Sequence, residues 1–339
     1  FDILLEAQEA LRERNFMNFD PSKLSTINIS ENGRKIRLQK LETGENDWQV
    51  LESNGENEIQ PYRADPAIMD SLLKNLSTLR ASGFTADAPT ASDNENYGFN
   101  NPRRVVTLSF SVGDPLTLML AHPQGREDVL YAKTNLADFI FEVERYTTLR
   151  MIPLDTHYYR NRLLDMLPSA ARISALKLTN LEKNEAIFDY KIGQENMGWN
   201  DLIEEFDTEH GDQIRVLLDA VRKFEVKSYL IDSYTEAYPV DEENSLPWIF
   251  QLSATIQLPG GETDRTETRE YVLTERLSGT VQVAGSKQYN VIFEIPQPLI
   301  EALYELTDEM EIPPEMAEEP VLEPKPIDPV TAPAQINTP

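Results

Sequence analysis

The sequence contains no cysteine, which excludes disulfide bonds, thiol catalysis and every thiolate metal site. It also lacks any apolar run of about 18 residues, the length that a membrane-spanning helix needs. Neither glycine-rich phosphate pattern, G-x-x-x-x-G-K or G-x-G-x-x-G, occurs, so nothing favours nucleotide binding. The missing cysteines do not identify the compartment, because bacterial envelope proteins often contain none.

Positive charge is scarce as well. The 31 Lys and Arg residues face 58 Asp and Glu residues, which gives a net charge of −27. Such a surface repels a phosphate backbone, so nucleic acids and anionic lipids are disfavoured as partners. Hydrophobic residues make up 40% of the 339 residues, and the length exceeds the roughly 250 residues that a single core usually serves. We therefore expect two globular units.

The first half of the chain alternates between helix and strand patterns. Residues 1–16 combine good helix formers with an apolar stripe and predict a short amphipathic helix. Apolar residues alternate with polar ones at 27–29 and again at 36–38, and E-N-G-R between them predicts a hairpin. Asp65 as N-cap and Pro66 in the first helical position predict the next helix.

A second group of strands follows. Apolar residues alternate with polar ones from Val106 to Val112 and again over 116–120, and D-V-L-Y-A-K adds a further strand. Together they predict a meander. We expect a helix over about residues 135–147 to close this unit.

The second half of the chain repeats this order. I-S-A-L-K-L at 173–178 matches L-S-T-I-N-I at 24–29, and Trp199 follows a strand pair as Trp48 does. The segment 290–306 is expected to parallel 129–144, after strands at 250–258 and a turn at P-G-G-E-T-D. The helices match at a constant offset of 145: Leu72, Leu73, Leu76, Leu79 and Phe84 correspond to Leu217, Leu218, Val221, Phe224 and Tyr229.

These patterns predict an α+β protein with two tandem, structurally similar units, each an antiparallel sheet packed with helices. The expected boundaries are an N-terminal helix or linker at 1–19, a first unit at 20–165, a second unit at 166–310 and a tail at 311–339. The tail holds eight of the 22 prolines and no aromatic residue. Such a composition cannot form a core, so we expect the tail to be disordered.

Several stretches resemble the bacterial family catalogued as domain of unknown function 4340. They are the ribbon N-D-W-Q-V, the helix D-P-A-I-M-D-S-L-L-K-N-L-S-T-L-R-A-S-G-F, the Tyr97-Gly98-Phe99 turn before Pro102, and the segments V-L-Y-A-K and Y-Y-R-N-R-L-L-D-M. The likeness extends over about residues 20–310. Two features depart from the family: Phe99 stands where Leu is usual, and the acidic, proline-rich tail is not a family hallmark.

The resemblance implies an envelope protein with one N-terminal membrane helix and an extracytoplasmic body. Such proteins are often encoded beside auxiliary subunits of ABC transporters of the gliding-motility type. The family has no established catalytic residues, so none is implied for this chain. The sequence starts at Phe1 without an initiator Met, which leads us to expect a signal or anchor upstream.

The stretch D-N-E-N-Y-G-F-N-N-P-R-R has one glycine in the position that a calcium loop requires. Asp93 and Glu95 stand in the first and third positions and Gly98 in the sixth. A calcium loop also needs a bidentate carboxylate in the twelfth position, where this sequence has Arg104. We therefore interpret the stretch as a turn before a strand.

Other candidate sites are equally open to a structural interpretation. His122, His157 and His210 lack the i, i+4 spacing of a helical zinc site and are expected to be surface or capping residues. A-G-S-K-Q-Y at 284–289 resembles a nucleophile elbow only distantly and is better explained as a hairpin turn. The sequons at Asn28 and Asn75 fall in a predicted strand and helix, which makes glycosylation there unexpected.

Acidic and aromatic residues leave two further possibilities. Pairs such as Glu204 with Glu205, or Asp241 with Glu242, could serve a glycosidase, although solvated faces are expected among so many carboxylates. The three tryptophans could form a sugar platform, but each adjoins an alternating strand and is expected in a core: Trp48, Trp199 and Trp248.

No catalytic, cofactor-binding or metal-binding residue is predicted, and no cofactor. The sequence favours a non-enzymatic, membrane-anchored protein-interaction module on the extracytoplasmic (periplasmic) face of the bacterial inner membrane. Its expected partners are proteins, with auxiliary subunits of an ABC transporter as the leading candidates. The alternatives are a protein that binds a glycan or small ligand, and a carboxylate-dependent envelope hydrolase.

Overall fold

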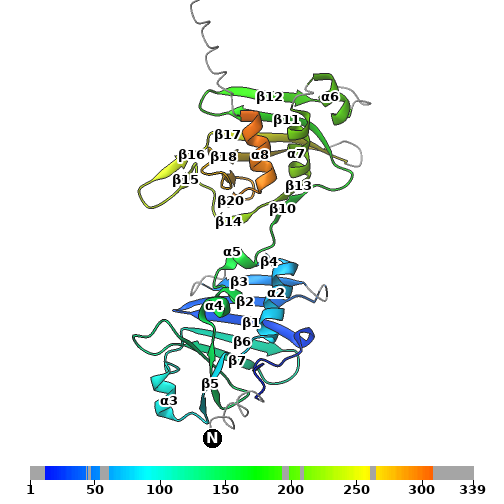
Figure 1. The fold of residues 1–339 in the computed structure, drawn as a ribbon. Coiled ribbons are helices and arrows are strands. Elements are labelled where there is room, and N and C mark those ends of the chain that lie inside the picture. Colours follow the sequence, from blue (N-terminus) through cyan, green and yellow to red (C-terminus); the bar gives the residue numbers. More distant parts are fainter. Residues whose placement is uncertain are drawn as a thin grey trace, which may run out of the picture.

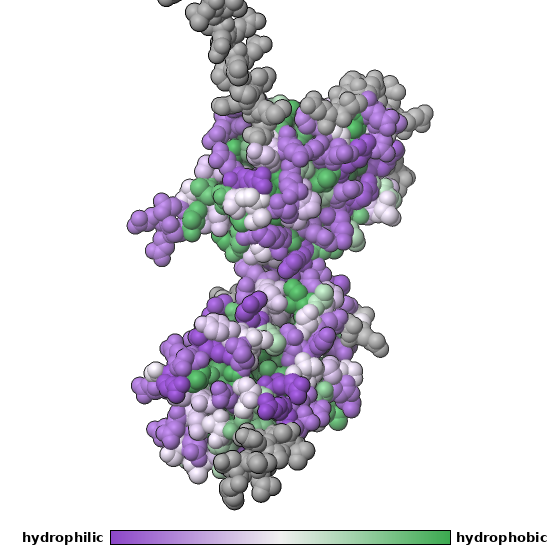
Figure 2. Space-filling view, viewed as in Figure 1, coloured by the Kyte–Doolittle hydropathy of each residue, from purple (hydrophilic) through white to green (hydrophobic). Residues whose placement is uncertain are grey.

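The computed structural model describes residues 12–42, 44, 47–53, 61–192, 198–206, 210–259 and 265–307. Within this part of the chain, two large antiparallel sheets each carry their own buried core. Figure 1 shows one sheet in each half of the molecule, and Figure 2 shows a narrow waist between the halves.

The first sheet has nine strands in the order β4-β3-β2-β1-β6-β7-β8-β9-β5. A short 3-10 helix, Pro21–Lys23, precedes it. The strands are β1 (Leu24–Glu31), β2 (Arg34–Lys40), β3 (Trp48–Ser53), β4 (Tyr62–Arg63), β5 (Gly83–Asp87), β6 (Arg104–Phe110), β7 (Leu116–Ala121), β8 (Leu130–Thr134) and β9 (Phe139–Val143). The helices of this unit are α2 (Pro66–Ser77), α3 (Ala91–Asn96), α4 (Arg145–Met151) and α5 (Thr156–Tyr159).

The second sheet has seven strands in the order β12-β11-β17-β18-β19-β20-β14. They are β11 (Arg172–Asn180), β12 (Glu185–Lys191), β14 (Ser228–Ile231), β17 (Phe250–Leu258), β18 (Arg265–Leu273), β19 (Val283–Ser286) and β20 (Val291–Glu294). Two small ribbons accompany them: β10 (Leu163–Met166) with β13 (Lys223–Glu225), and β15 (Ala237–Pro239) with β16 (Ser245–Pro247). The helices are α6 (Trp199–Phe206), α7 (Gly211–Arg222) and α8 (Gln297–Thr307).

The two sheets follow one plan, which confirms the predicted tandem α+β units. Strands β2-β1-β6-β7-β8-β9-β5 correspond in order to β12-β11-β17-β18-β19-β20-β14. The irregularities match too, because the β1–β6 register shifts between Leu24 and Thr26, and the β11–β17 register shifts between Ile173 and Ala175. Helices α2 and α7 each contain 12 residues and begin at Pro66 and Gly211, the predicted offset of 145.

Local sequence explains the best predicted elements. In the β1–β2 hairpin, Asn32 and Gly33 both have positive φ, at 51° and 84°, as a tight hairpin turn requires. At the start of α2, the Asp65 side chain accepts hydrogen bonds from the backbone N–H groups of Ala67 and Ile68. The helix buries Met69, Leu72 and Leu76 against the sheet, and each such side chain contributes about 1.5–3 kcal/mol.

The units differ at one edge of the sheet. In the first unit, β3 and β4 extend the sheet beyond β2. In the second unit, the chain after β12 instead reaches helix α6, which begins at Trp199. The Trp199 indole N–H donates to the carbonyl of Ile173 at 2.8 Å, and Trp48, at the start of β3, is only 3% exposed. Trp48 therefore lies on a strand of its sheet, whereas Trp199 lies on a helix whose first residue contacts its sheet.

The predicted helix at about 135–147 is wrong. Residues Phe139–Val143 form β9, between β8 and β5, and helix α4 begins only at Arg145. Because β9 lies inside the sheet, neighbouring residues such as Ile140 and Phe141 are both buried, and the alternation typical of a half-exposed strand is lost. The segment 290–306 contains β20 and α8, so its counterpart begins at β9 and continues through α4, later in the chain than the predicted 129–144.

Two smaller predictions need correction. Residues 12–16 of the predicted N-terminal helix are not helical, and Asn15 forms a β-bridge with Arg80. Val112 does not continue the alternation of β6, because the strand ends at Phe110 and Val112 is 87% exposed in the turn. The rest of the N-terminal helix, the turn at 260–264 and the tail at 311–339 lie outside the described residues.

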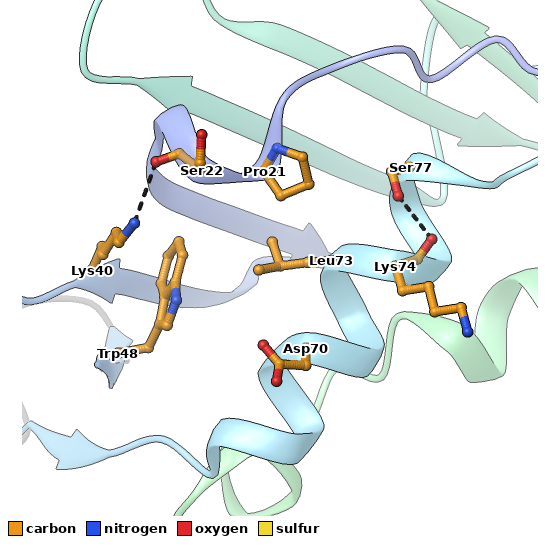
Figure 3. A pocket seen from close by; sticks show the side chains of 8 residues that line it. All are labelled: Pro21, Ser22, Lys40, Trp48, Asp70, Leu73, Lys74 and Ser77. Carbon is orange, nitrogen blue, oxygen red and sulfur yellow. Dashed lines mark hydrogen bonds between the residues drawn. The ribbon is translucent and has the colours of Figure 1, made fainter. Parts of the chain in front are cut away.

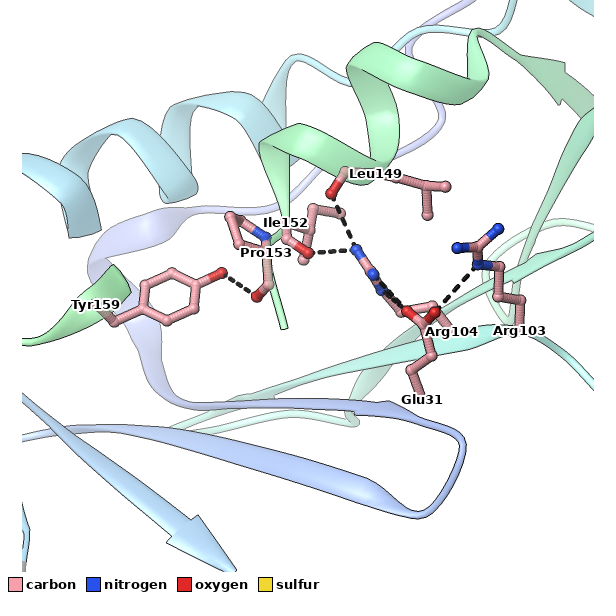
Figure 4. Close-up of polar contacts among 7 residues, drawn as sticks. All are labelled: Glu31, Arg103, Arg104, Leu149, Ile152, Pro153 and Tyr159. Carbon is pink, nitrogen blue, oxygen red and sulfur yellow. Dashed lines mark hydrogen bonds and ion pairs between the residues drawn. The ribbon is translucent and has the colours of Figure 1, made fainter. Parts of the chain in front are cut away.

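A buried arginine fixes the segment that leaves the first sheet (Figure 4). Arg104 begins β6 opposite Glu31 of β1, and its Nε lies 2.6 Å from that carboxylate. Arg104 also donates to the carbonyls of Leu149, at 3.0 Å, and Ile152, where helix α4 ends. The last carbonyls of a helix have no partner within the helix, so Arg104 satisfies them while Glu31 neutralises its charge. Helix α4 is thereby tied to the sheet.

Candidate functional site

The two units meet around Arg160, directly after helix α5. Its guanidinium carbon lies 3.8 Å from the ring centre of Tyr62 in the first unit and 3.6 Å from that of Tyr229 in the second. Its Nη1 contacts the Asp232 carboxylate at 2.6 Å. The side chain is only 13% exposed, so these cation–π and ionic contacts act with little competition from water. We call Tyr62, His157, Arg160, Tyr229 and Asp232 the junction cluster.

His157 completes this cluster on helix α5. Its Nε2 lies 3.0 Å from the second oxygen of Asp232. The hydrogen bond to Asp232 raises the pKa of His157 above its ordinary value, although burial opposes the charge. For Asp232, burial acts to raise the pKa, but the hydrogen bonds and charges of His157 and Arg160 outweigh it and lower that pKa. The cluster therefore favours a protonated histidine beside an ionised aspartate.

The contacts of the cluster join the two units. Asp232 has one oxygen bound by His157 and the other by Arg160. Asp155, the nearby carboxylate, caps helix α5 by accepting from the backbone N–H of His157 at 3.0 Å. The Tyr229 hydroxyl donates to the carbonyl of Asn161, which adds a further cross-unit contact. Both carboxylates thus have structural partners.

A second feature lies beside Trp248 in the second unit. Trp248 stacks on Tyr234, with ring centres 6.2 Å apart, and its indole N–H donates to the Thr235 carbonyl. Gly285 allows this arrangement, because a Cβ there would approach the Trp248 ring to 3.0 Å. These aromatic residues line a pocket of about 400 Å³ together with Leu181, Glu236, Pro247, Gln251, Glu270, Val272 and Lys287.

The β15–β16 hairpin rises from the edge of this pocket. In Figure 1 it projects from the side of the second unit, and Figure 2 shows its hydrophilic end standing away from the body. Asp241 stabilises the turn by accepting from the backbone N–H groups of Glu243 and Asn244. Glu242 and Glu243 are exposed, and Val240 is 53% exposed. The tip thus combines negative charge with one apolar side chain.

A groove in the first unit lies between helix α2 and the end of β2 (Figure 3). Its volume is about 500 Å³, and the Trp48 ring and Leu73 form its apolar floor. The Lys40 ammonium group donates to the Ser22 carbonyl at 3.3 Å, and Asp70 lines the opposite, helical side. An aromatic ring with nearby polar groups is a common arrangement in small-ligand sites.

The glycine stretch before β6 proves to be a close-packed turn. Asp93 lies in helix α3 and closes a capping box with Thr90. Gly98 has φ +85°, and a Cβ there would meet the His122 carbonyl oxygen at 2.2 Å, so glycine is required. Arg104, in the twelfth position of the supposed calcium loop, is the buried arginine that pairs with Glu31. The interpretation as a turn before a strand holds for residues 97–103, but helix α3, which includes Asp93 and Glu95, was not predicted.

The other residues considered from sequence are dispersed. His122 lies next to the Gly98 turn, and His210 occupies the N-cap of α7 without a side-chain capping bond. Glu204 is exposed on α6, and the side chain of Glu205 lies outside the described part. The A-G-S-K-Q-Y segment ends β19 and forms the turn into β20, as expected. Asn28 and Asn75 fall in β1 and α2, as predicted.

Two general findings hold for the described residues. They contain no grouping of three or more His, Asp or Glu side chains that could hold a metal ion. Every described helix also falls short of the length and apolar character that crossing a bilayer demands.

The model of one protein family matches the chain twice, over residues 1–102 and 57–243. Together the matches span more than half of the sequence. The chain belongs to the family described as domain of unknown function (DUF4340). The longer match runs through the junction cluster to the β15–β16 hairpin, so this DUF4340 protein carries family sequence across both units. No curated protein and no solved structure matches the chain.

The sequence offered no signal for the junction cluster. His157 and Asp232 are 75 positions apart, and each is unremarkable among its neighbours. The stretch Y-Y-R-N-R, already part of the DUF4340 resemblance, contains Arg160 and was the nearest clue. His157 departs from the expected surface or capping role, because it also bridges the units.

Proposed function

We propose that the protein is a non-enzymatic, membrane-anchored interaction module on the extracytoplasmic face of the bacterial inner membrane. Its partners would be proteins of an ABC-transporter-associated envelope complex. The family resemblance supports the cellular location and the kind of partner, and the fold supplies the candidate docking surface. The observation that carries the proposal is the β15–β16 hairpin, a projecting element that the shared plan of the two units does not require.

The β15–β16 hairpin has no counterpart strand pair in the first unit. Between β14 and β17 the second unit inserts β15 and β16, whereas the first unit has helix α3 at the corresponding place, between β5 and β6. Among the described residues, β15 pairs with β16 alone, and neither strand joins the main sheet. Its tip bears Asp241, Glu242 and Glu243, all exposed. A partner surface with Lys or Arg side chains around a small apolar depression would fit this tip.

Affinity purification of the full-length, anchored protein from its native envelope tests the proposal. The informative variant is Glu242→Lys with Glu243→Lys, which reverses the tip charge and leaves the turn-forming Asp241 in place. The matched control is Asp114→Lys with Glu127→Lys, two exposed acidic residues of the first unit. We expect transporter components to be recovered with the wild type and the control, and to be lost with the tip variant.

Two results would contradict this proposal. The first is recovery of no transporter component with the wild type under crosslinking. The second is equal recovery with the tip variant and the control, which would show that the hairpin is not the docking element.

The groove beside Trp48 favours a second candidate function, the binding of a glycan or small ligand. Lys40 and Asp70 line the groove with groups that hydrogen-bond to hydroxyls, and Trp48, which at 3% exposure offers no stacking face, lies close enough to report binding by its fluorescence. Titration of the protein with envelope glycan fragments, followed by tryptophan fluorescence, tests this candidate. We expect Asp70→Ala to abolish any saturable change if the groove binds sugar. No observation at the junction favours the hydrolase, whose two carboxyl groups would have to face a substrate.

A further inference from the structure

Strand β2 turns a basic face away from the core. Its sequence is R-K-I-R-L-Q-K, so it carries a local excess of positive charge although acidic residues outnumber basic ones 58 to 31 in the chain. Ile36 and Leu38 are buried in the core that helix α2 covers. The alternation of side chains along a strand therefore puts Lys35 and Arg37 on the opposite side of the sheet, where both are exposed.

The strands beside β2 extend this surface without adding a carboxylate. Arg37 lies opposite Asn28 of β1. Arg63 of β4, which is exposed, lies opposite Gln49 of β3, on the same side of the sheet as Arg37. Among the described side chains that β4, β3, β2, β1 and β6 present on this side, none is Asp or Glu. We call this side of the five strands, with Lys35, Arg37 and Arg63, the cationic face.

The charges of the cationic face have no ionic partner within the described part of the chain. Neither Lys35, Arg37 nor Arg63 forms an ion pair with another described residue. The Gln49 amide nitrogen donates to the amide oxygen of Gln39 at 3.2 Å, so the end of Gln39 that remains for a ligand is its nitrogen, a donor. The face therefore offers positive charge and hydrogen-bond donors together, which suits a carboxylate.

The second unit neutralises the equivalent face within its own sheet. The register shifts of β1 and β11 match, which puts Lys177 in the place of Asn28 and Asp189 in the place of Arg37. Asp189 lies 4.0 Å from Lys177 and 3.5 Å from Lys191. The shared plan thus allows an ion pair at this position, and the described part of the first unit has none there.

We propose that the cationic face binds an acidic segment of a partner protein. Arginine presents its N–H groups in a fork that fits both oxygens of a carboxylate, and lysine adds a compact positive charge. The five strands span about 19 Å, since neighbouring strands lie about 4.8 Å apart. A protein segment rich in Asp and Glu can lie within that width and contact all three cations.

The charge outside the face disfavours a membrane or a nucleic acid as the occupant. The whole chain carries −27, so the cationic face is a small positive area on an acidic molecule. Salt screens repulsion only beyond about 8 Å at physiological ionic strength. A bilayer or a duplex carries phosphates far beyond the five strands, and these would meet the acidic remainder of the surface. A protein segment can end before it reaches them.

Fluorescence anisotropy with a fluorescein-labelled oligoglutamate peptide tests the inference on the whole chain. A peptide of about eight residues, roughly 27 Å when extended, crosses the entire face. We expect saturable binding at low salt and weaker binding as added salt screens the charges. Arg37→Glu should weaken binding about tenfold, because it removes an attractive contact and adds a repulsive one. Arg37→Gln, which only removes the charge, should weaken it about threefold.

The matched control is Lys191→Glu, the same change of charge on the equivalent face of the second unit. It should bind the peptide as the wild type does. Both positions are exposed in strands, so neither variant should alter the far-UV circular dichroism spectrum. Glu242→Lys with Glu243→Lys should also retain peptide binding, which keeps this test separate from that of the hairpin and its transporter partner.

The inference is overturned if the wild type shows no saturable binding of the peptide, or if Lys191→Glu weakens binding as much as Arg37→Glu does. A sedimentation assay with phosphatidylglycerol vesicles covers the remaining alternative. We expect no binding to the vesicles. Wild-type protein that sediments with them, while Arg37→Glu stays in solution, would assign the cationic face to a membrane surface and so contradict the proposal.

Discussion

At the scale of single residues, a buried side chain can contribute far more to stability than its neighbour in sequence. Arg104 is 6% exposed and holds both Glu31 and the end of helix α4, whereas the adjacent Arg103 is half-buried and pairs with Glu31 at 3.1 Å. A charge that loses its partner in a buried site is costly, while an exposed ion pair contributes little. Neighbouring arginines should therefore differ greatly in their effect on stability.

This contrast gives the first prediction. Arg104→Ala should lower the free energy of unfolding by about 3 kcal/mol, because two helix carbonyls lose their buried partner and Glu31 keeps only the partly exposed Arg103. Arg103→Ala should cost at most about 1 kcal/mol. Urea unfolding of both variants, followed by circular dichroism, measures the difference. Equal losses would mean that the buried arginine contributes no more than a surface pair.

At the scale of elements, helix α2 shows how far local sequence determines structure. Asp65 and Pro66 mark its start as predicted, and Met69, Leu72 and Leu76 form its buried face. Because the signals of a helix N-terminus are local, the contribution of the Asp65 cap can be measured with a single substitution.

Asp65→Ala removes the acceptor of two backbone N–H groups and should destabilise the first unit by about 1 kcal/mol. Asp70→Ala, on the exposed side of the same helix, is the control and should change stability by less than about 0.5 kcal/mol. Thermal unfolding of the two variants is the measurement. A larger effect at Asp70 would indicate that the Trp48 groove, rather than the cap, dominates.

Prediction failed where burial, rather than local periodicity, decides the element. The hairpins, α2 and α7 were predictable because one face of each is exposed to solvent. Polar and apolar residues therefore recur with the period of a strand or a helix. Strand β9 was mistaken for a helix because the sheet surrounds it and Ile140, Phe141 and Val143 are all buried. The junction cluster joins residues far apart in sequence, so neither period nor spacing could indicate it. The Trp248 pocket requires glycine at position 285, because the Trp248 ring packs against that backbone. The sequence alone does not show that these two residues are in contact.

At the scale of the whole molecule, the junction cluster links the two units through ionisable groups. The raised pKa of His157 means that its contribution is complete below the ordinary value of 6.5 and is lost as pH rises through the raised pKa. The lowered pKa of Asp232 means that its contribution is complete above 3.8 and is lost as pH falls through the lowered pKa. The link between units should thus be strongest in mildly acidic solution.

His157→Gln tests this pH dependence. We expect the wild type to exceed the variant in Tm most clearly between pH 3.8 and 6.5, and the advantage to shrink as the histidine loses its proton. Thermal scans over about pH 5 to 8 measure the difference. His122→Gln, a histidine outside the cluster, is the control. A wild-type advantage that stays constant across this range would show that the protonated form of His157 is not what joins the units.

The strand order also governs how the protein can be made. Strand β5 leaves the ribosome before β6, yet its partner is β9, with Gly83 opposite Glu142, and β14 likewise waits for β20. In each nascent unit, one early strand stays unpaired until the last strand of that unit emerges. Bringing two strands together that are so far apart in sequence closes a long loop, which slows folding. The first unit can finish while the second is still being translated. Chaperone contacts during synthesis should therefore occur in two successive waves, each ending when the last strand of a unit emerges.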